Sequence, residues 1–189
     1  MRAVVQRVSS ASVSVEGQVI SQISRGLMVL VGIGKGKTSR LPIDDTESDV
    51  SSLTNKILSL RVFSDAVDAS KMWKNNVRDV EGDILCVSQF TLLAETRKGN
   101  KPDFHNAMPG EQSRALYTTF LEVLRRAYKP EKVQDGRFGA MMNVTLTNEG
   151  PVTFTLDSRK FEYTPVPVSL AGGSTVQAVN GMSGDPPAQ

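Results

Sequence analysis

Three polar side chains interrupt an apolar segment in the middle of this 189-residue chain. Ser88, Gln89 and Thr91 lie within residues 84–93, a run that otherwise has the composition of a buried strand. Polar groups near the end of such a strand indicate that one side of this end faces something polar. A second unusual segment is NEGPVT at 148–153, where Gly150-Pro151 connects two alternating stretches although a simple hairpin prefers Asn-Gly. Only about 5 to 6% of X-Pro bonds in folded proteins are cis, so these residues by themselves do not predict a cis bond.

The segment GIGKGKT at 32–38 follows an apolar run, as a phosphate-binding loop should. Its spacing does not fit, because such a loop ending at Thr38 needs glycine where Val31 stands, and a dinucleotide fingerprint needs glycine where Lys37 stands. Leu41-Pro42 also separates the loop from the helix whose amides would hold a phosphate. We interpret the segment as a basic turn, with a nucleotide-dependent enzyme as the less favoured alternative.

The chain has one cysteine, Cys86, and one histidine, His105. These counts exclude an internal disulfide, a zinc site of Cys and His ligands, and any site with two histidines. A metal held by carboxylates alone remains possible. We expect Cys86 to pack in an apolar strand, because no adjacent cation lowers its pKa. We expect His105 to be a surface or capping group, although a Ser/His/Asp triad would also use it.

Charge limits the modes of nucleic-acid binding that are open to this protein. The chain has 22 Lys and Arg against 20 Asp and Glu, a net charge of +2, so no chain-wide basic field can hold a polyanion. One local basic segment, TRKGNK at 96–101, follows the strand that contains Ser88. It fits a solvated turn and a phosphate-contacting loop about equally well.

Hydrophobic periodicity predicts the elements that must position these groups. Apolar residues recur with helical spacing in residues 44–60, which contain Val50, Leu53 and Ile57, and in residues 110–128. Strand patterns cover residues 2–8, 11–16, 19–23, 27–33, 61–63, 84–93, 143–147 and 152–156, with 27–33 as a central strand. The prediction is an α/β domain whose curved, mostly antiparallel, barrel-like sheet is covered by two main helices.

Composition predicts one domain with a tail. Apolar residues make up 39% and charged residues 22% of the chain, which suffices for one sizeable core. We place the domain at residues 1–159 and a flexible Pro/Gly-rich tail at 160–189, although a partner could order part of it. The longest apolar run is too short to span a bilayer, so we expect a soluble cytoplasmic protein without membrane contact.

Several segments together resemble the D-aminoacyl-tRNA deacylase family, also called D-tyrosyl-tRNA deacylases. They are MRAVVQRV at 1–8, SQFTL at 88–92, KGNKPDF at 98–104, GRFGAMMNV at 136–144 and NEGPVT at 148–153. SQFTL and N-x-G-P-V-T are the defining motifs of the family, and their joint occurrence about 60 residues apart is specific. The resemblance covers residues 1 to about 159, so the tail lies outside it.

The resemblance implies a translation quality-control enzyme that hydrolyses the ester of D-aminoacyl-tRNA, and of glycyl-tRNA mischarged on a non-cognate tRNA. Family members are homodimers in which a Gly-cisPro dipeptide of one subunit enters the active site of the other. By this resemblance, Gly150-Pro151 is that dipeptide, and it excludes L-residues because it leaves no space for their Cβ. The implied partners are a second copy of the chain and the 3′ acceptor end of tRNA. No cofactor and no metal are implied.

The resemblance also assigns residue roles. The implied catalytic residues are Ser88, Gln89, Phe90 and Thr91, with the amides of Phe90 and Thr91 stabilising an oxyanion. We expect no nucleophilic role for Thr91, because no evident base activates it, and instead expect help from the ribose 2′-hydroxyl. The implied substrate-binding residues are Arg7, Phe138, Gly139, Met142, Asn148, Gly150, Pro151, Val152 and Thr153.

Some of these roles have plain alternatives. Arg7 would brace the dipeptide, but it also fits a charge at a sheet edge. Phe138, Gly139 and Met142 would receive the adenine, but Phe138 and Met142 equally fit a core. Lys98 and Lys101 are candidate phosphate contacts. The alternative to the enzyme as a whole is a non-catalytic nucleic-acid-binding module that uses the basic loop and the tail.

Overall fold

The computed structural model of the chain describes residues 1–35, 44–97 and 99–159. Six strands, two α-helices and two short 3-10 helices follow one another along this part of the chain. Their bounds are β1 (Arg2–Val15), β2 (Gln18–Ile23), β3 (Gly26–Gly32), α1 (Glu47–Ser59), β4 (Asp83–Ser88), η1 (Phe90–Leu93), α2 (Gly110–Ala127), η2 (Pro130–Lys132), β5 (Val133–Asp135) and β6 (Asn143–Asp157). The predicted tail and the end of the predicted basic turn, Gly36 to Thr38, lie outside the described residues.

The strands form one strongly curved sheet in which β1 is central. β1 pairs antiparallel with β2, β3 and β6, whereas β4 pairs parallel with β3 on one side and with β5 on the other. β2 turns back toward β5, where the Ser21 hydroxyl donates to the Asp135 carbonyl, so the sheet is nearly closed into a barrel. Antiparallel pairing predominates, which confirms the predicted fold class. The two parallel pairs make the sheet a mixed one.

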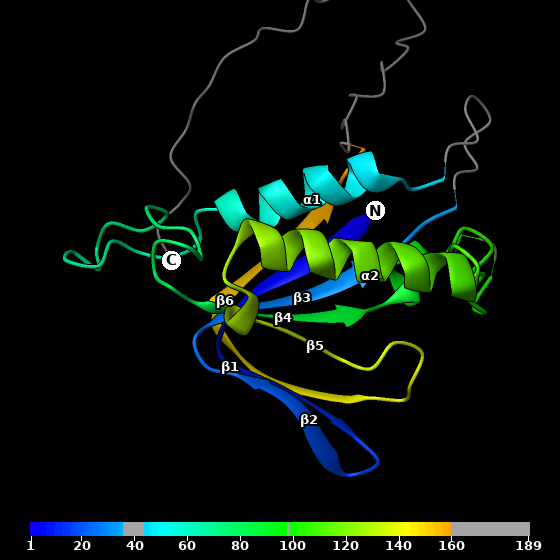
Figure 1. The fold of residues 1–189 in the computed structure, drawn as a ribbon, viewed down its shortest axis with the longest axis horizontal. Coiled ribbons are helices and arrows are strands. Elements are labelled where there is room, and N and C mark those ends of the chain that lie inside the picture. The colour runs from blue at the N-terminus through cyan, green and yellow to red at the C-terminus, as the bar shows by residue number, and fades with distance from the viewer. Residues whose placement is uncertain (36–43, 98, 160–189) are drawn as a thin grey trace, which may run out of the picture.

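The two long helices lie side by side across one face of the sheet (Figure 1). In α1, Val50, Leu53 and Ile57 are buried, as their spacing predicts. The Asp49 carboxylate accepts from the Thr46 amide at 2.9 Å, so a capping interaction fixes where this helix begins. Between the helices and the sheet lies the main core, whose largest fully buried side chains include Phe63, Phe120, Leu27 and Leu124.

A second apolar cluster fills the concave side of the curved sheet. It consists of the buried residues Val8, Ala11, Val13, Ile23, Met28, Leu85 and Val87. Both faces of β3 and β4 are therefore covered, which explains why residues 27–33 read as a continuous apolar run. The strand ends that carry the candidate site project from this rigid, doubly covered region.

Four strand predictions are wrong for physical reasons. The stretch 84–93 is not one strand, because β4 ends at Ser88 and residues 90–93 form η1. Residues 2–8 and 11–16 are one strand, β1, and residues 143–147 and 152–156 are one strand, β6, whose register with β1 shifts at a bulge. The predicted strand at 61–63 contributes only an isolated bridge from Phe63 to Asn75, because the chain there leaves the sheet.

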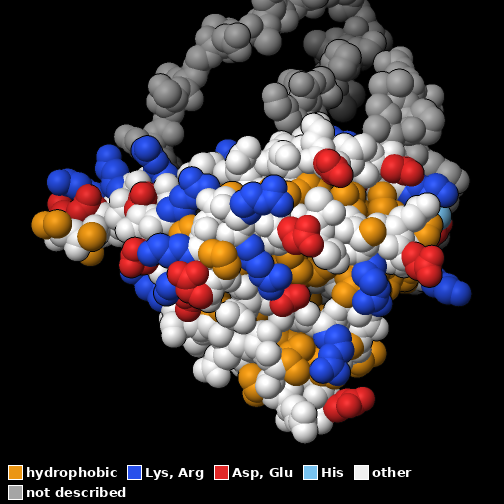
Figure 2. All heavy atoms as spheres, viewed as in Figure 1, with side chains coloured by type: hydrophobic (Ala, Val, Ile, Leu, Met, Phe, Trp, Pro, Cys, Tyr) orange, Lys and Arg blue, Asp and Glu red, His pale blue; other side chains and the backbone are white. Residues whose placement is uncertain are grey.

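The surface of the described residues agrees with the nearly balanced charge. Figure 2 shows Lys and Arg side chains interspersed with Asp and Glu side chains over α1 and α2, without a continuous basic face in this view. In the described part of the chain, no helix combines the length and the hydropathy that crossing a bilayer requires.

Candidate active site

A pocket of about 560 Å³ opens where β4 ends, beside the start of α2. Four chain segments form its walls: the end of β4 with η1, the end of β3, the turn into α2 with its first turn, and the segment that leads into β6. The lining residues are Val31, Ile33, Val87, Ser88, Gln89, Phe90, Ala107, Met108, Gly110, Ser113, Phe138, Gly139, Ala140, Met141, Met142 and Val144. The pocket thus brings together two sets of predicted site residues, at 88–90 and at 138–142.

The first wall is held rigidly by the neighbouring strand. The Gln89 amide donates to the Val31 carbonyl at 2.7 Å, so the chain is still tied to β3 one residue after β4 ends. A Cβ on Gly32 would lie 2.4 Å from Leu93 and 3.0 Å from the Gln89 carbonyl, so only glycine lets β3 approach η1 this closely. The turn that contains Phe90 and Thr91 is consequently fixed against the core.

The amide N–H groups of Phe90 and Thr91 are left open by this turn. The hydrogen bonds of η1 begin with the Leu92 amide, which donates to Gln89, and neither the Phe90 nor the Thr91 amide has an acceptor among the described residues. Two adjacent amides at the start of a short helix can bind negative charge that develops on an oxygen atom.

The Thr91 hydroxyl has a partner within the same turn. It accepts from Gln89 Nε2 at 2.6 Å, and both side chains are at least partly exposed. Among the described residues, no histidine, lysine or carboxylate hydrogen-bonds to this hydroxyl. The arrangement orients Thr91 without providing a base.

Phe138 forms the opposite wall and is held from two sides. Its ring packs against Tyr117 with centroids 5.7 Å apart, and the Arg114 guanidinium lies 4.7 Å above its centroid. Burial raises the pKa of the Tyr117 hydroxyl, so this residue is a neutral packing partner. Phe138 and Met142 both pack against the apolar clusters and also line the pocket, so the core alternative is compatible with a position at the site.

Gly150-Pro151 does not line the pocket of its own chain. Both residues are exposed, the bond between them is cis, and the dipeptide lies within β6 where its register with β1 shifts. Asn148 holds this bulge, because its Nδ2 donates to the Arg7 carbonyl at 2.8 Å and to the Val152 carbonyl at 3.2 Å. Its Oδ1 accepts from Thr153 at 3.1 Å and from Gln6 at 3.3 Å.

Arg7 lies beneath the dipeptide. Its Nη1 donates to the Val62 carbonyl at 2.5 Å, and its Nε lies 3.7 Å from the Glu149 carboxylate. A Cβ built on Gly150 would come within 3.2 Å of Arg7 Nη2 and within 2.9 Å of the Val152 amide nitrogen. The Arg7 guanidinium therefore lies next to both Gly150 and the Glu149 carboxylate.

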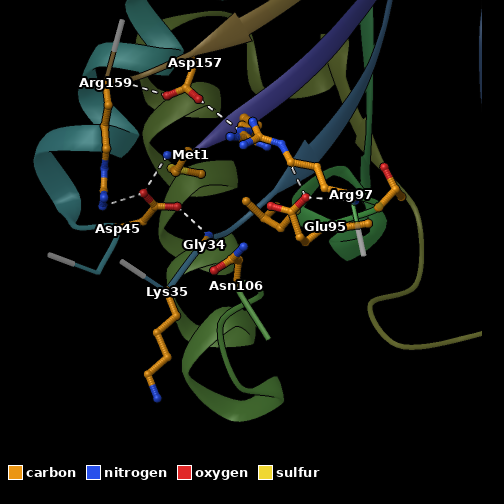
Figure 3. Close-up of a pocket in the computed structure, with 13 residues that line it drawn as sticks. Met1, Gly34, Lys35, Asp45, Glu95, Arg97, Asn106, Asp157 and Arg159 are labelled. Atoms are coloured by element: carbon orange, nitrogen blue, oxygen red, sulfur yellow. Dashed lines mark hydrogen bonds and ion pairs between the residues drawn. The ribbon is translucent and has the colours of Figure 1, made fainter. Parts of the chain in front are cut away.

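A second, polar pocket of about 480 Å³ is lined by Met1, Gly34, Asp45 and Arg159, among other residues (Figure 3). Asp45 is buried at its base and accepts from the Met1 amine at 2.6 Å, from the Gly34 amide at 2.6 Å and from Arg159 at 2.9 Å. Arg2 pairs with Asp157 at 3.1 Å on the same wall. Because these charges neutralise one another, the arrangement ties the two ends of the domain together.

The other reactive candidates have structural roles. Cys86 is fully buried, and burial raises the pKa of its thiol, as expected for a packing residue. His105 Nδ1 lies 2.7 Å from the exposed Asp103 carboxylate and does not line the pocket. Lys101 is exposed, and Lys98 lies outside the described residues. Among residues 1–35, 44–97 and 99–159, no group of three His, Cys, Asp or Glu side chains is placed to hold a metal.

Sequence patterns did not identify several residues that line the pocket. Ala107 and Met108 precede α2, Ser113 lies in its first turn, and Ile33 follows β3. The helical spacing of α2 marked its start but gave no sign that this end would meet β4. Only the crossing of β3, β4 and α2 in three dimensions brings these residues to the site.

Comparison with known proteins relates this geometry to a family. The model of the family described as D-Tyr-tRNA(Tyr) deacylase matches residues 4–157. A Saccharomyces cerevisiae protein named D-aminoacyl-tRNA deacylase is 51% identical over 158 residues, which cover 84% of this chain and 99% of that protein.

Two solved structures share the architecture. One, named c-Myc DNA Unwinding Element Binding Protein, has a TM-score of 0.75 and 50% identity and covers 83% of this chain and 98% of its own. The other, a probable eukaryotic D-amino acid tRNA deacylase, has a TM-score of 0.70 and covers 82% of this chain and 98% of its own. At 20% identity, the second structure supports the fold alone.

Proposed function

The chain belongs to the D-Tyr-tRNA(Tyr) deacylase family and is a hydrolase, and from this premise we propose that it cleaves the ester joining a D-amino acid to the 3′-terminal adenosine of tRNA. The products are free tRNA and the D-amino acid. Glycine carried by a non-cognate tRNA is included among the proposed substrates, because a filter that excludes a Cβ cannot exclude glycine. A cytoplasmic location, where aminoacyl-tRNA is used, is part of this proposal.

The observation that carries the proposal is the pair of open amides at Phe90 and Thr91 beside a pocket of about 560 Å³. An ester carbonyl that reaches these amides would receive two hydrogen bonds as its oxygen becomes negative. One donor of this kind contributes about 2.7 to 4 kcal/mol to transition-state stabilisation in other hydrolases. The terminal adenine would lie against Phe138, Gly139 and Met142, which line the same pocket.

The proposed reaction uses water as the nucleophile. Its oxygen adds to the ester carbonyl carbon, and the resulting oxyanion accepts from the two amides. The bond to the ribose 3′ oxygen then breaks, and the proton given up by water goes to that oxygen. The neighbouring 2′-hydroxyl orients the water and relays the proton. Ser88 and Gln89, which line the pocket, are the proposed hydrogen-bonding partners of the substrate.

Substitution of Thr91 by alanine should leave kcat/KM for D-tyrosyl-tRNA within about tenfold of the parent value. The reason is that its hydroxyl is engaged by Gln89 Nε2 and has no base in contact among the described residues. The measurement is ester loss under steady-state conditions, with Thr118→Ala, an exposed helix position, as the matched control. A loss of several decades would assign Thr91 a direct chemical role and reject the water mechanism.

We further propose that Gly150-Pro151 selects for chirality from the partner subunit of a homodimer. This arrangement is supported by the exposure of both residues, by their absence from the pocket of their own chain, and by the bracing from Arg7 and Asn148. In the partner's pocket, the backbone carbonyls of the dipeptide would bind the α-amino group of the substrate and leave no space for the Cβ of an L-residue. Val152 and Thr153 would hold the dipeptide in place.

Matched D-tyrosyl-tRNA and L-tyrosyl-tRNA test the function directly. We expect rapid loss of the D-ester at catalytic enzyme concentration, little loss of the L-ester, and the same rates with and without EDTA. Equal rates on both esters would reject the chiral filter, and no turnover of either would reject the enzyme proposal. A rate that falls on adding EDTA would require a metal held by carboxylates.

A second candidate function is nucleic-acid binding without catalysis. It is favoured by the likeness to the c-Myc DNA Unwinding Element Binding Protein, which is named for DNA binding and shares 50% identity with this chain. Binding of duplex DNA at physiological salt, with a steep fall of affinity as salt rises, would support this alternative. The net charge of +2 argues for at most a small phosphate footprint.

A further inference from the structure

Two aromatic side chains meet on the surface at the mouth of the candidate active site. The rings of Phe90 and Phe104 pack edge to face, with centroids 5.0 Å apart and planes at 69°. Phe90 remains 57% exposed and Phe104 38% exposed, and neither ring belongs to the two apolar clusters of the described residues. Because Phe90 also lines the pocket, the pair extends the pocket wall outward onto the surface.

The segment that carries Phe104 is fixed at both ends. Glu95 and Asp103 exchange backbone hydrogen bonds of 2.7 and 3.0 Å, which hold these two residues side by side. Beyond Phe104, the Ala107 amide donates to the Phe104 carbonyl at 2.9 Å, and the Met108 amide donates to the Ile33 carbonyl at 3.0 Å. The ring is thus presented beside the pocket by a braced loop.

The charges on this loop favour an anionic ligand next to the rings. Arg97 pairs with Glu95 at 3.6 Å, and His105 contacts Asp103 at 2.7 Å, so both carboxylates of the loop already have partners. Lys101, on the same segment, is exposed. An exposed aromatic ring on a segment that also carries an exposed lysine suits a nucleotide, which offers a base to stack and a phosphate to neutralise.

We propose that Phe104, supported by Phe90, is a stacking platform for the base that precedes the terminal adenosine of tRNA, with Lys101 near its phosphate. This inference rests on the proposed function, since it takes the terminal adenosine to occupy the pocket. The acceptor end is single-stranded, so the preceding nucleotide leaves through the mouth of the pocket, where the aromatic pair lies. Stacking on aromatic side chains is the usual way in which proteins hold unpaired bases.

Three substrates with the same scissile ester distinguish a loss of base stacking from a loss of ester hydrolysis itself. They are D-tyrosyl-tRNA, the dinucleotide cytidylyl-adenosine with D-tyrosine on its 3′ end, and D-tyrosyl-adenosine, which lacks the preceding nucleotide. We expect Phe104→Ala to lower kcat/KM about 5- to 150-fold for the first two and to leave the third unchanged. Phe104→Leu, which keeps an apolar side chain without a ring, should lose activity likewise, and Phe104→Trp should retain it. Val19→Ala, an exposed apolar position on β2, is the control.

Three results would overturn the platform. They are an equal loss on D-tyrosyl-adenosine, full activity of Phe104→Ala on tRNA, and a change in oligomeric state of Phe104→Ala in size-exclusion chromatography. The last result would identify the pair as a contact between subunits. If the parent protein cleaves none of the three esters, the proposed function fails. The stacking platform is then tested on its own by measuring the binding of oligonucleotides. In that case Phe104→Ala should weaken binding of the trinucleotide CCA but not of adenosine, and equal binding would reject the platform.

Discussion

Replacing Gly150 with alanine should lower kcat/KM for D-tyrosyl-tRNA by about 100-fold or more, because small displacements of positioning groups have effects of this size. Gly150 has a φ of +119°, and an added Cβ would lie 2.7 Å from Val152 Cγ2 and 2.9 Å from the Val152 amide nitrogen. A backbone atom cannot move aside without shifting β6, so the substitution displaces the dipeptide. The measurement is the rate of ester loss on matched D- and L-tyrosyl-tRNA.

Gly17 provides a control that separates backbone strain from the role of the site. It also has a positive φ, +81°, in the turn between β1 and β2, but an added Cβ would have open space around it. Gly17→Ala should lose about 1 kcal/mol of stability from the left-handed backbone and keep full activity. Parental activity and D/L selectivity in Gly150→Ala would contradict the proposed role of Gly150-Pro151 as the chiral filter.

Substitution of Asp45 by alanine should lower the free energy of unfolding by about 3 to 5 kcal/mol, because it leaves buried charges without their partner. The Asp45 side chain is only 3% exposed and accepts from the Met1 amine and from the Gly34 amide, both at 2.6 Å. It also binds Arg159, so one carboxylate joins the starts of β1 and α1 to the end of β6. Urea denaturation followed by circular dichroism measures the effect.

Two further variants make the Asp45 result specific. Asp45→Asn keeps an oxygen acceptor for the Gly34 amide but loses the charge, so it should fall between the parent and the alanine variant. Asp68→Asn removes an exposed carboxylate that pairs with Lys71 at 3.3 Å, and it should leave the denaturation midpoint unchanged. An Asp45→Ala protein as stable as the parent would show that this network contributes nothing net.

Elements whose residues follow a single period could be predicted from the sequence. Val50, Leu53 and Ile57 defined α1, and the apolar run at 27–33 defined β3, since helix and strand spacings differ clearly there. β6 was divided in two because Gly150-Pro151 usually marks a turn, and only its pairing with β1 carries the strand through a bulge. β5 was missed because three residues are too few to show a pattern.

Part of the site could also be predicted. The polar residues at 88–91 were recognised because they break an apolar run. The same run suggested a continuous strand, so the turn at Phe90, which leaves two amides without acceptors, was not predicted. Helical turns of this length have no periodicity of their own, and the apolar Phe90, Leu92 and Leu93 fit a strand equally well. The contribution of Ile33, Met108 and Ser113 depends on the crossing of distant segments, which local patterns do not contain.

Because β1 is paired along both of its edges, it cannot unfold locally without its neighbours. Its first half lies between β3 and β6, and its second half lies between β2 and β6. Its amide protons can therefore exchange with solvent only when a neighbouring strand detaches, which makes β1 part of the most cooperative unit of the fold. Arg7 belongs to this strand, and its carbonyl accepts from Asn148, so we expect the anchor of the bulge at Gly150-Pro151 to be among the last parts of the fold to exchange.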